Sequence, residues 1–110
     1  DWTRARVLDP ASGGGAFLLP AAERMIAALP AAEPGFVLRQ IGTRLQGLEL
    51  DPYAAGFGQN AIELLLADVT AAAGRPAPTV IRVADTLEEP PAPRFDLVIG
   101  NPPYGRVTLT

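Results

Sequence analysis

Two side chains that dominate metal and acid–base chemistry are missing from this sequence, because its 110 residues contain no cysteine and no histidine. The absence of cysteine excludes disulfides and metal sites with thiolate ligands. The absence of histidine removes the commonest general base and metal ligand near neutral pH. We therefore expect no metal centre.

Long apolar stretches are also missing. The longest one, "AIELLLADV" (61–69), contains Glu63 and Asp68, whereas a membrane span needs about 20 apolar residues. The first ten residues, "DWTRARVLDP", are charged and do not resemble a signal peptide. Apolar residues nevertheless make up 48% of the chain, which is a globular composition. These features predict a soluble cytoplasmic protein whose residues 1–110 form a single domain.

Positive charge is scarce, since the formal net charge is −3. This balance argues against a phosphate-binding surface on these residues alone. If the protein acts on nucleic acid, most of the contacts must come from elsewhere. The first predicted strand begins almost at the start of the sequence, and nothing further is predicted after "NPPYGRVTLT" (101–110). We therefore expect these residues to be part of a longer protein.

Strands and helices alternate along the chain. Apolar runs predict strands over residues 5–9, 44–51, 80–85 and 95–100. Helical spacing of Phe17, Ala21, Met25, Ala28 and Leu29 predicts a helix that starts near Gly15, and further helices are expected over 37–44 and 52–74, with a loop over 30–36. This order predicts an α/β fold with a mostly parallel sheet and helices on both faces.

A polar residue stands at the end of each predicted strand. These residues are Asp9, Glu49, Asp85 and Asn101. In open parallel sheets, ligands bind at the carboxyl ends of the strands, near the point where the strand order reverses. The four polar ends therefore predict one cleft at this edge.

A glycine turn, Gly13 to Gly15, separates the first strand from the first helix. Glycines let a ligand approach the backbone and the free N–H groups of the helix N-terminus, although a plain flexible turn would use the same residues. Leu18 stands where the dinucleotide fingerprint needs its third glycine, and no Gly-Lys-Ser/Thr follows as in a P-loop. The turn thus favours a nucleoside ligand without a diphosphate over NAD or ATP.

The acidic strand ends suit the two polar parts of a nucleoside. The Glu49 carboxylate can accept hydrogen bonds from both ribose hydroxyls. The Asp85 carboxylate can accept one from the exocyclic amine of adenine. For Glu49 a solvated strand end, and for Asp85 an N-cap or turn, remain alternative interpretations.

The stretch "FDLVIGNPPYGRV" (95–107) ends an apolar strand in a stiff corner. Pro102 and Pro103 fix two φ angles and remove two backbone donors. The Asn101 side-chain oxygen and the Pro102 carbonyl could both accept from one amino group, and the Tyr104 ring could stack on a planar base. The alternative is a purely structural Asn-Pro turn.

Four stretches together resemble one family. "DPASGGGAFL" (9–18) is similar to the motif D-P-A-C-G-S-G-A-F-L, and "GLELDPYA", "VADTL" and "FDLVIGNPPY" follow in the family's order. The chain thus resembles, from about residue 5 to 107, the S-adenosylmethionine-dependent DNA adenine-N6 methyltransferases of restriction–modification and phage-defence systems. The resemblance implies the N-terminal part of a catalytic domain with a truncated, Rossmann-like methyltransferase fold. The target-recognition domain would lie outside these residues.

The resemblance also implies roles for individual residues. The cofactor-binding set would be Asp9, Ala11, Gly13, Gly15, Phe17, Glu49, Leu50, Asp85 and Thr86, and the catalytic set Asn101, Pro102, Pro103 and Tyr104. The target adenine would be flipped out of the DNA duplex. Ser12 and Gly14 replace the family's usual cysteine and serine; both are small, and the chemistry uses no thiol.

Other functions remain open from the sequence. Relatives that methylate RNA or a protein glutamine share N-P-P-Y but usually carry D-x-G-x-G-S-G in the first motif, so "DPASGGGAF" favours the DNA branch. The third hypothesis is that the chain is a non-catalytic part of a larger assembly. The expected partners are double-stranded DNA and restriction or defence subunits, with no membrane, and an open edge strand would favour self-association.

Overall fold

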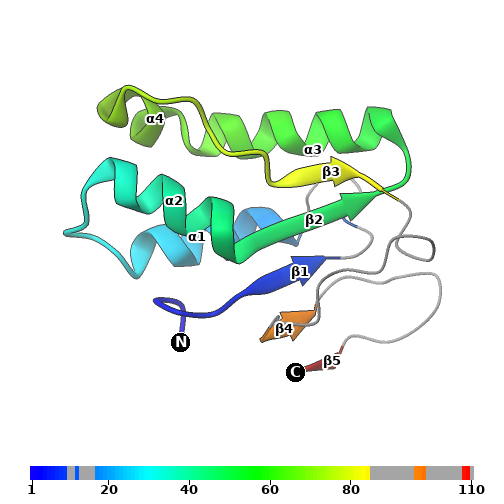
Figure 1. Cartoon of the computed structure of the whole chain (residues 1–110), viewed down its shortest axis with the longest axis horizontal. Coiled ribbons are helices and arrows are strands. Elements are labelled where there is room, and N and C mark those ends of the chain that lie inside the picture. The colour runs from blue at the N-terminus through cyan, green and yellow to red at the C-terminus, as the bar shows by residue number, and fades with distance from the viewer. Residues whose placement is uncertain (10–11, 13–16, 85–95, 99–107, 110) are drawn as a thin grey trace.

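The computed structural model describes residues 1–9, 12, 17–84, 96–98 and 108–109, which form a sheet and the helices around it (Figure 1). In chain order the elements are β1 (Val7–Asp9), α1 (Leu18–Ala27), α2 (Pro34–Arg44), β2 (Leu45–Glu49), α3 (Pro52–Leu65), α4 (Ala67–Ala73), β3 (Ile81–Val83), β4 (Leu97–Val98) and β5 (Thr108–Leu109). This order confirms the predicted α/β fold.

The sheet has the strand order β3-β2-β1-β4-β5. The first four of these strands are parallel to one another, and β5 pairs antiparallel with β4. The mostly parallel sheet is therefore confirmed, whereas β5 was not predicted, because two residues carry no recognisable period. The chain leaves β1 for β2 and β3 on one side and returns to β4 on the other. The strand order thus reverses between β1 and β4, where such sheets bind ligands.

Helix α1 begins at Leu18 and buries Leu18, Ala21, Ala22 and Met25. Pro20 lies in the first turn, where its missing N–H would have no helical partner. Phe17 belonged to the predicted apolar stripe, yet 53% of its surface is exposed. The reason is that Phe17 is the N-cap residue and precedes the buried face of the helix.

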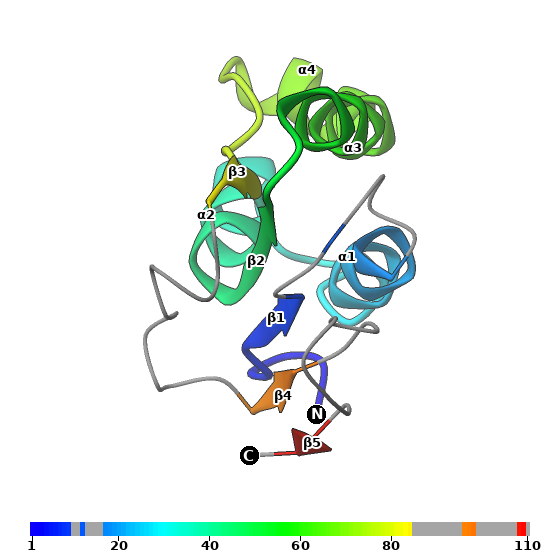
Figure 2. The same cartoon turned by 90° about the vertical axis from the view of Figure 1, so that its right-hand side faces the viewer.

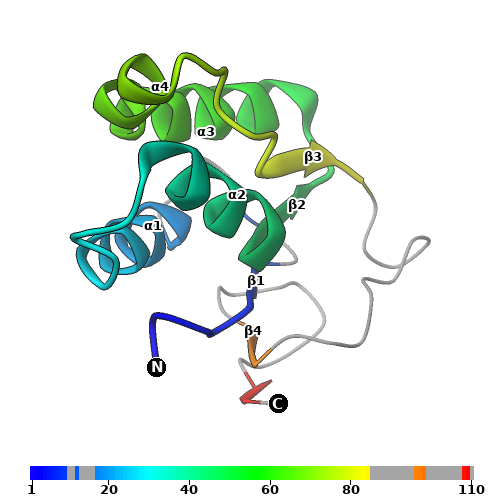
Figure 3. The same ribbon diagram turned by 60° about the vertical axis from the view of Figure 1, so that its left-hand side comes forward.

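The other helices differ from the prediction at their ends. Helix α2 starts at Pro34, earlier than the predicted residue 37, because a proline suits the first helical position. The single helix predicted over 52–74 is two helices, α3 and α4, which are separated at Leu66 (φ −90°, ψ 5°). The break turns α4 onto α2, and the two helices lie side by side beyond the amino ends of β2 and β3 (Figure 3). Gly74 ends α4 at φ 65°, in the left-handed region that glycine tolerates.

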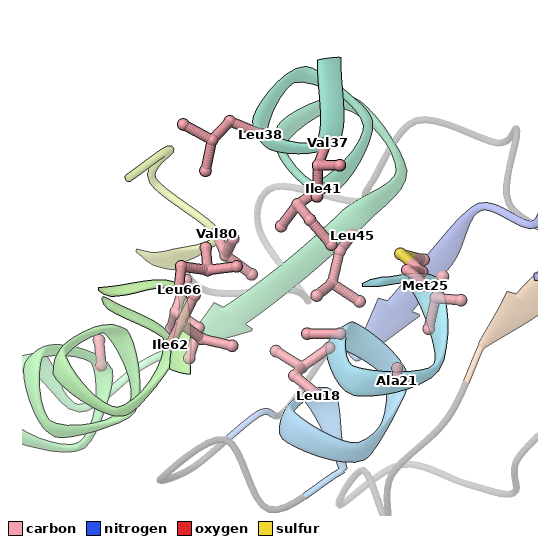
Figure 4. Close-up of a cluster of buried hydrophobic side chains, with 14 residues drawn as sticks. Leu18, Ala21, Met25, Val37, Leu38, Ile41, Leu45, Ile62, Leu66 and Val80 are labelled. Carbon is pink, nitrogen blue, oxygen red and sulfur yellow. The ribbon is translucent and has the colours of Figure 1, made fainter. Parts of the chain in front are cut away.

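The main hydrophobic core lies between the sheet and the helices. Side chains of α1, α2 and α3 converge on Leu45 of β2 and on Val80 just before β3 (Figure 4). Viewed along the strands, α1 and α3 lie on the same side of the sheet (Figure 2). Leu8, Leu48 and Ala84 form a second, smaller cluster. Because strand side chains alternate between faces, this cluster belongs to the opposite face.

Hydrogen bonds fasten the N-terminal segment to the sheet. Arg44, at the end of α2, is buried and donates through Nη1 to the carbonyl oxygens of Trp2 and Ala5, both at 3.0 Å. Burial lowers the pKa of the Arg44 guanidinium, because desolvation disfavours its charge. Arg6 N–H donates to Asp96 Oδ2 at 2.8 Å, and Asp96 N–H donates to the Arg6 carbonyl at 2.8 Å. These last two bonds join the start of β1 to the start of β4.

Within the ranges that the structure describes, no helix is long and apolar enough to cross a membrane.

Candidate functional site

Asp9 and Glu49 stand at the carboxyl ends of the neighbouring strands β1 and β2, as predicted. The parallel register pairs Asp9 with Gly47, two residues before Glu49. Since side chains alternate along a strand, both carboxylates belong to the face that carries α1 and α3. Asp9 is fully buried and Glu49 is half-buried. Two carboxylates of different exposure thus occupy one edge.

Ser12 connects the end of β1 to β2. Its N–H donates to the Leu48 carbonyl at 2.9 Å, and its side chain is 4% exposed. The buried Ser12 Oγ has no hydrogen-bond partner in the described part of the chain. A Cβ placed on Gly47 would lie only 3.0 Å from the Ser12 Cβ and 2.5 Å from Leu18 Cδ1. The missing side chain of Gly47 therefore makes room for Ser12 and for the start of α1.

The segment after β2 is held by its own side chains. Glu49 Oε2 accepts a hydrogen bond from Asp51 N–H at 2.9 Å, which orients the Glu49 carboxylate. Asp51 is the N-cap of α3, and its Oδ1 accepts from Tyr53 N–H at 2.9 Å. Leu50, between them, is 67% exposed. An apolar side chain is thus presented to solvent beside an oriented carboxylate.

Strand β3 continues the same edge. Val83 pairs with Glu49, and Ala84 N–H donates to the Glu49 carbonyl at 2.9 Å. The regular strand ends at Val83, two residues before the predicted end at residue 85. Asp85 and Thr86 lie outside the described residues.

Strand β4 lies on the other side of β1 and runs parallel to it, with Val7 opposite Leu97 and Leu8 opposite Val98. The sequence N-P-P-Y begins three residues after the end of β4. The remaining predicted site residues, namely Ala11, Gly13, Gly15, Asn101, Pro102, Pro103 and Tyr104, lie outside the described residues.

The donor groups at this edge fit a cationic nucleoside such as S-adenosylmethionine. Carboxylates accept hydrogen bonds from hydroxyls and attract a sulfonium charge, and Ser12 Oγ is a buried hydroxyl without a partner among the described residues. The exposed Leu50 offers an apolar surface for a base. No group of three or more potential metal ligands was found where the chain is described. The donor set thus suits the predicted cofactor.

A cavity of about 600 Å³ lies far from this edge. It is lined by residues such as Thr70, Gly74 and Arg75 at the end of α4, at the opposite end of the molecule from the carboxyl ends of the strands (Figure 1). None of the predicted site residues lines it. We assign it no role in the site.

Sequence reasoning gave no role to the Ser12 hydroxyl. The sequence indicated only that Ser12 follows Asp9, the last residue of the first strand, by three residues. Its burial depends on the contact with Gly47, which is distant in sequence.

A mostly parallel α/β sheet with acidic strand ends beside its reversal point places the protein in the Rossmann-like fold class. The particular family follows from the sequence: the chain belongs to the N-6 DNA Methylase family, which it matches over residues 2–108.

Named relatives agree with this assignment. The chain is 36% identical over 111 residues to the Type II methyltransferase M.PaeR7I of Pseudomonas aeruginosa, an alignment that covers 94% of this chain and 19% of that protein. The chain therefore spans only 19% of the length of the curated relative it matches.

Solved structures show the same fold. The M protein of the Type I restriction enzyme EcoKI superimposes with a TM-score of 0.69 and 28% identity over 93% of this chain and 21% of that one. A nuclease-deletion mutant of the Type ISP restriction–modification enzyme LlaGI, solved in complex with a DNA substrate mimic, gives a TM-score of 0.64. Its 19% identity over 84% of this chain and 8% of that one indicates a shared fold only.

Proposed function

We propose that this chain is part of an S-adenosylmethionine-dependent DNA methyltransferase that methylates adenine N6 within a restriction–modification system. The observation that carries the proposal is the family match over residues 2–108, which includes both the acidic strand ends and N-P-P-Y. The names of the relatives support it: one is a Type II methyltransferase, and another is the M protein of a Type I restriction enzyme.

In this proposal the cofactor lies along the carboxyl ends of β1, β2 and β3. The methionine part is held by the first motif, that is, by Asp9, Ala11, Gly13, Gly15 and Phe17. Glu49 accepts from the ribose hydroxyls, Leu50 packs on the adenine, and Asp85 with Thr86 meets the adenine amine. The buried carboxyl group of Asp9 places oxygen acceptors at this edge. S-adenosylmethionine supplies an electrophilic methyl group at this place.

The corner after β4 holds the target base. The Asn101 side-chain oxygen and the Pro102 carbonyl accept hydrogen bonds from the N6 amine of a flipped adenine, which favours a localised lone pair on N6. Pro103 keeps the corner rigid. Tyr104 stacks on the base. This arrangement needs no histidine or lysine base, and the sequence contains neither residue.

The partners follow from the same proposal. Double-stranded DNA is the substrate, and restriction or defence subunits are the protein partners. A net charge of −3 is unsuited to a phosphate backbone, so other parts of the protein supply most DNA contacts. The protein acts in the cytoplasm, where its DNA substrate is found.

A methyl-transfer assay tests the proposal. The protein as its gene encodes it is incubated with methyl-labelled S-adenosylmethionine and, separately, with DNA, RNA and protein extracts. We expect label only in DNA, as N6-methyladenine. Asn101→Ala should lower the rate by about 100-fold or more while cofactor affinity stays unchanged. The exposed Asn60 on α3 offers a matched control, Asn60→Ala, that should retain full activity. Label only in RNA or protein, or an unimpaired Asn101→Ala variant, would contradict the proposal.

A further inference from the structure

Gln59, in the middle of α3, holds the backbone just before and within β3. Its Oε1 accepts hydrogen bonds from Val80 N–H at 2.9 Å and Ile81 N–H at 3.0 Å, and its Nε2 donates to the Pro78 carbonyl at 2.9 Å. One carboxamide thus satisfies three backbone groups, the Pro78 carbonyl and the N–H groups of Val80 and Ile81, as a neighbouring strand would. Glu63, one turn later on α3, accepts from the same Nε2 at 3.2 Å.

Strand β3 has few other attachments. It lies at the edge of the sheet, and of its three residues only Ile81 is buried. Its pairing with β2 covers three residue pairs, flanked by bonds from Gly47 N–H to the Val80 carbonyl and from Ala84 N–H to the Glu49 carbonyl. An edge strand this short slips in register more easily than a central one, and a slip of one residue reverses the face of every side chain. The bonds from Gln59 oppose such a slip.

The register of β3 sets which residue of that strand lies opposite Glu49, and this residue is Val83. Ala84 N–H is bonded to the Glu49 carbonyl, and Asp85 is the next residue in the sequence. In the proposed function, on which this inference rests, Glu49 binds the ribose and Asp85 the adenine amine. The spacing between these two groups therefore depends on how β3 is anchored to α3.

We propose that Gln59 is a positioning residue for adenine recognition, which acts by anchoring the start of β3 to α3. It touches neither cofactor nor substrate. Loss of its three hydrogen bonds to the backbone lets β3 shift along β2. The carboxylate of Asp85 then no longer meets the adenine amine at hydrogen-bonding distance. Glu49, in the longer and more buried β2, keeps its place.

Binding of two ligands that differ at one atom tests this inference. S-adenosylhomocysteine carries the 6-amino group, whereas S-inosylhomocysteine carries an oxygen there. Calorimetry on the full-length protein gives the two Kd values. The wild type should prefer the adenosyl ligand by about tenfold or more, because the oxygen leaves a carboxylate without its donor. Gln59→Met, which keeps the length of the side chain but not its polar atoms, should bring the ratio of the two Kd values close to one.

Two more variants complete the experiment. Gln59→Asn is too short to reach β3 and should lower the ratio in the same way, which keeps the inference testable if the methionine variant does not fold. Asn60→Leu makes a matched amide-to-alkyl change at the neighbouring exposed position and should leave the ratio unchanged.

The outcomes separate this inference from the proposed function. Equal weakening of both ligands, with the ratio retained in the Gln59 variants, would show that Gln59 only stabilises the fold and would overturn the inference. A wild type that binds both ligands equally would also overturn it, because no amine recognition would exist to be positioned. A wild type that binds neither ligand would contradict the proposed function itself.

Discussion

Leu18, the first residue of α1, packs directly over Gly47 of β2. A Cβ on Gly47 would lie 2.5 Å from Leu18 Cδ1, closer than two carbon atoms can approach. The same Cβ would lie 3.1 Å from Ile81 Cγ1 of β3. The position of α1 thus depends on one residue without a side chain.

Gly47→Ala should therefore destabilise the protein. Overpacking of a buried site costs about 1–3 kcal/mol, and urea unfolding of the two proteins measures the difference. Gly56→Ala is the matched control, because Gly56 lies in α3 with no atom within 4 Å of its Cβ position. This control should stabilise the protein by about 0.5–1 kcal/mol, the helical advantage of alanine. Equal effects of the two substitutions would contradict the contact with Leu18.

Asp9 and Glu49 could be predicted as strand ends because each follows a short apolar run. The break at Leu66 could not, since the sequence from Ile62 to Val69 contains neither glycine nor proline. That break depends on the packing of α4 against α2, two segments about 30 residues apart. The hydrogen bonds of Gln59 to the backbone around β3 could not be predicted either, because a glutamine within a helix usually faces solvent.

Arg44 presents two opposing contributions to stability. Arg44→Met removes the hydrogen bonds to the Trp2 and Ala5 carbonyls, but it also removes a buried charge whose Nε and Nη2 lack partners in the described structure. Each contribution amounts to about 1–3 kcal/mol. We expect them to offset each other, so that the global unfolding free energy changes by less than about 1 kcal/mol.

The local effect of the same substitution should be larger. Without its anchor, the segment from Asp1 to Ala5 should open more often, and hydrogen exchange at Arg4 and Ala5 should accelerate about tenfold. These two amides donate to the Asp1 carbonyl in the folded protein. Arg39→Met, an exposed change on the same helix, should alter neither measurement. Unchanged exchange in Arg44→Met would show that the two bonds do not hold the segment.

Asp51 caps α3 through its side chain, so the type of replacement matters. Asp51→Ala should lower the unfolding free energy by about 1 kcal/mol. Asp51→Asn keeps an oxygen acceptor for Tyr53 N–H and should lower the unfolding free energy by only about 0.3 kcal/mol. Thermal unfolding of both variants distinguishes them. Similar losses for alanine and asparagine would mean that the negative charge, rather than the capping bond, stabilises the helix.

Glu49 is proposed to bind the ribose hydroxyls of the cofactor, and the structure describes its position. Glu49→Gln keeps the size of the side chain but weakens its bonds to hydroxyls, and the Kd for S-adenosylhomocysteine should rise about tenfold. Glu33→Gln is the matched control, because Glu33 is exposed and precedes α2, at the opposite end of that helix from β2. Calorimetry on the full-length protein measures both. A folded Glu49→Gln variant with wild-type affinity would remove Glu49 from the site.

The Ser12 hydroxyl should have opposite effects on stability and on binding. A buried hydroxyl without a partner costs about 1–3 kcal/mol, and Ser12 Oγ has none in the described structure. Ser12→Ala should therefore stabilise the ligand-free protein by about 1 kcal/mol. The same change should raise the Kd for S-adenosylhomocysteine if the hydroxyl binds the ligand, because Ser12 lies between the carboxyl ends of β1 and β2. Ser12→Cys, which preserves a side chain of similar size, should leave the affinity nearer to the wild type. A stabilised Ser12→Ala variant with unchanged affinity would show that the hydroxyl has no role in cofactor binding.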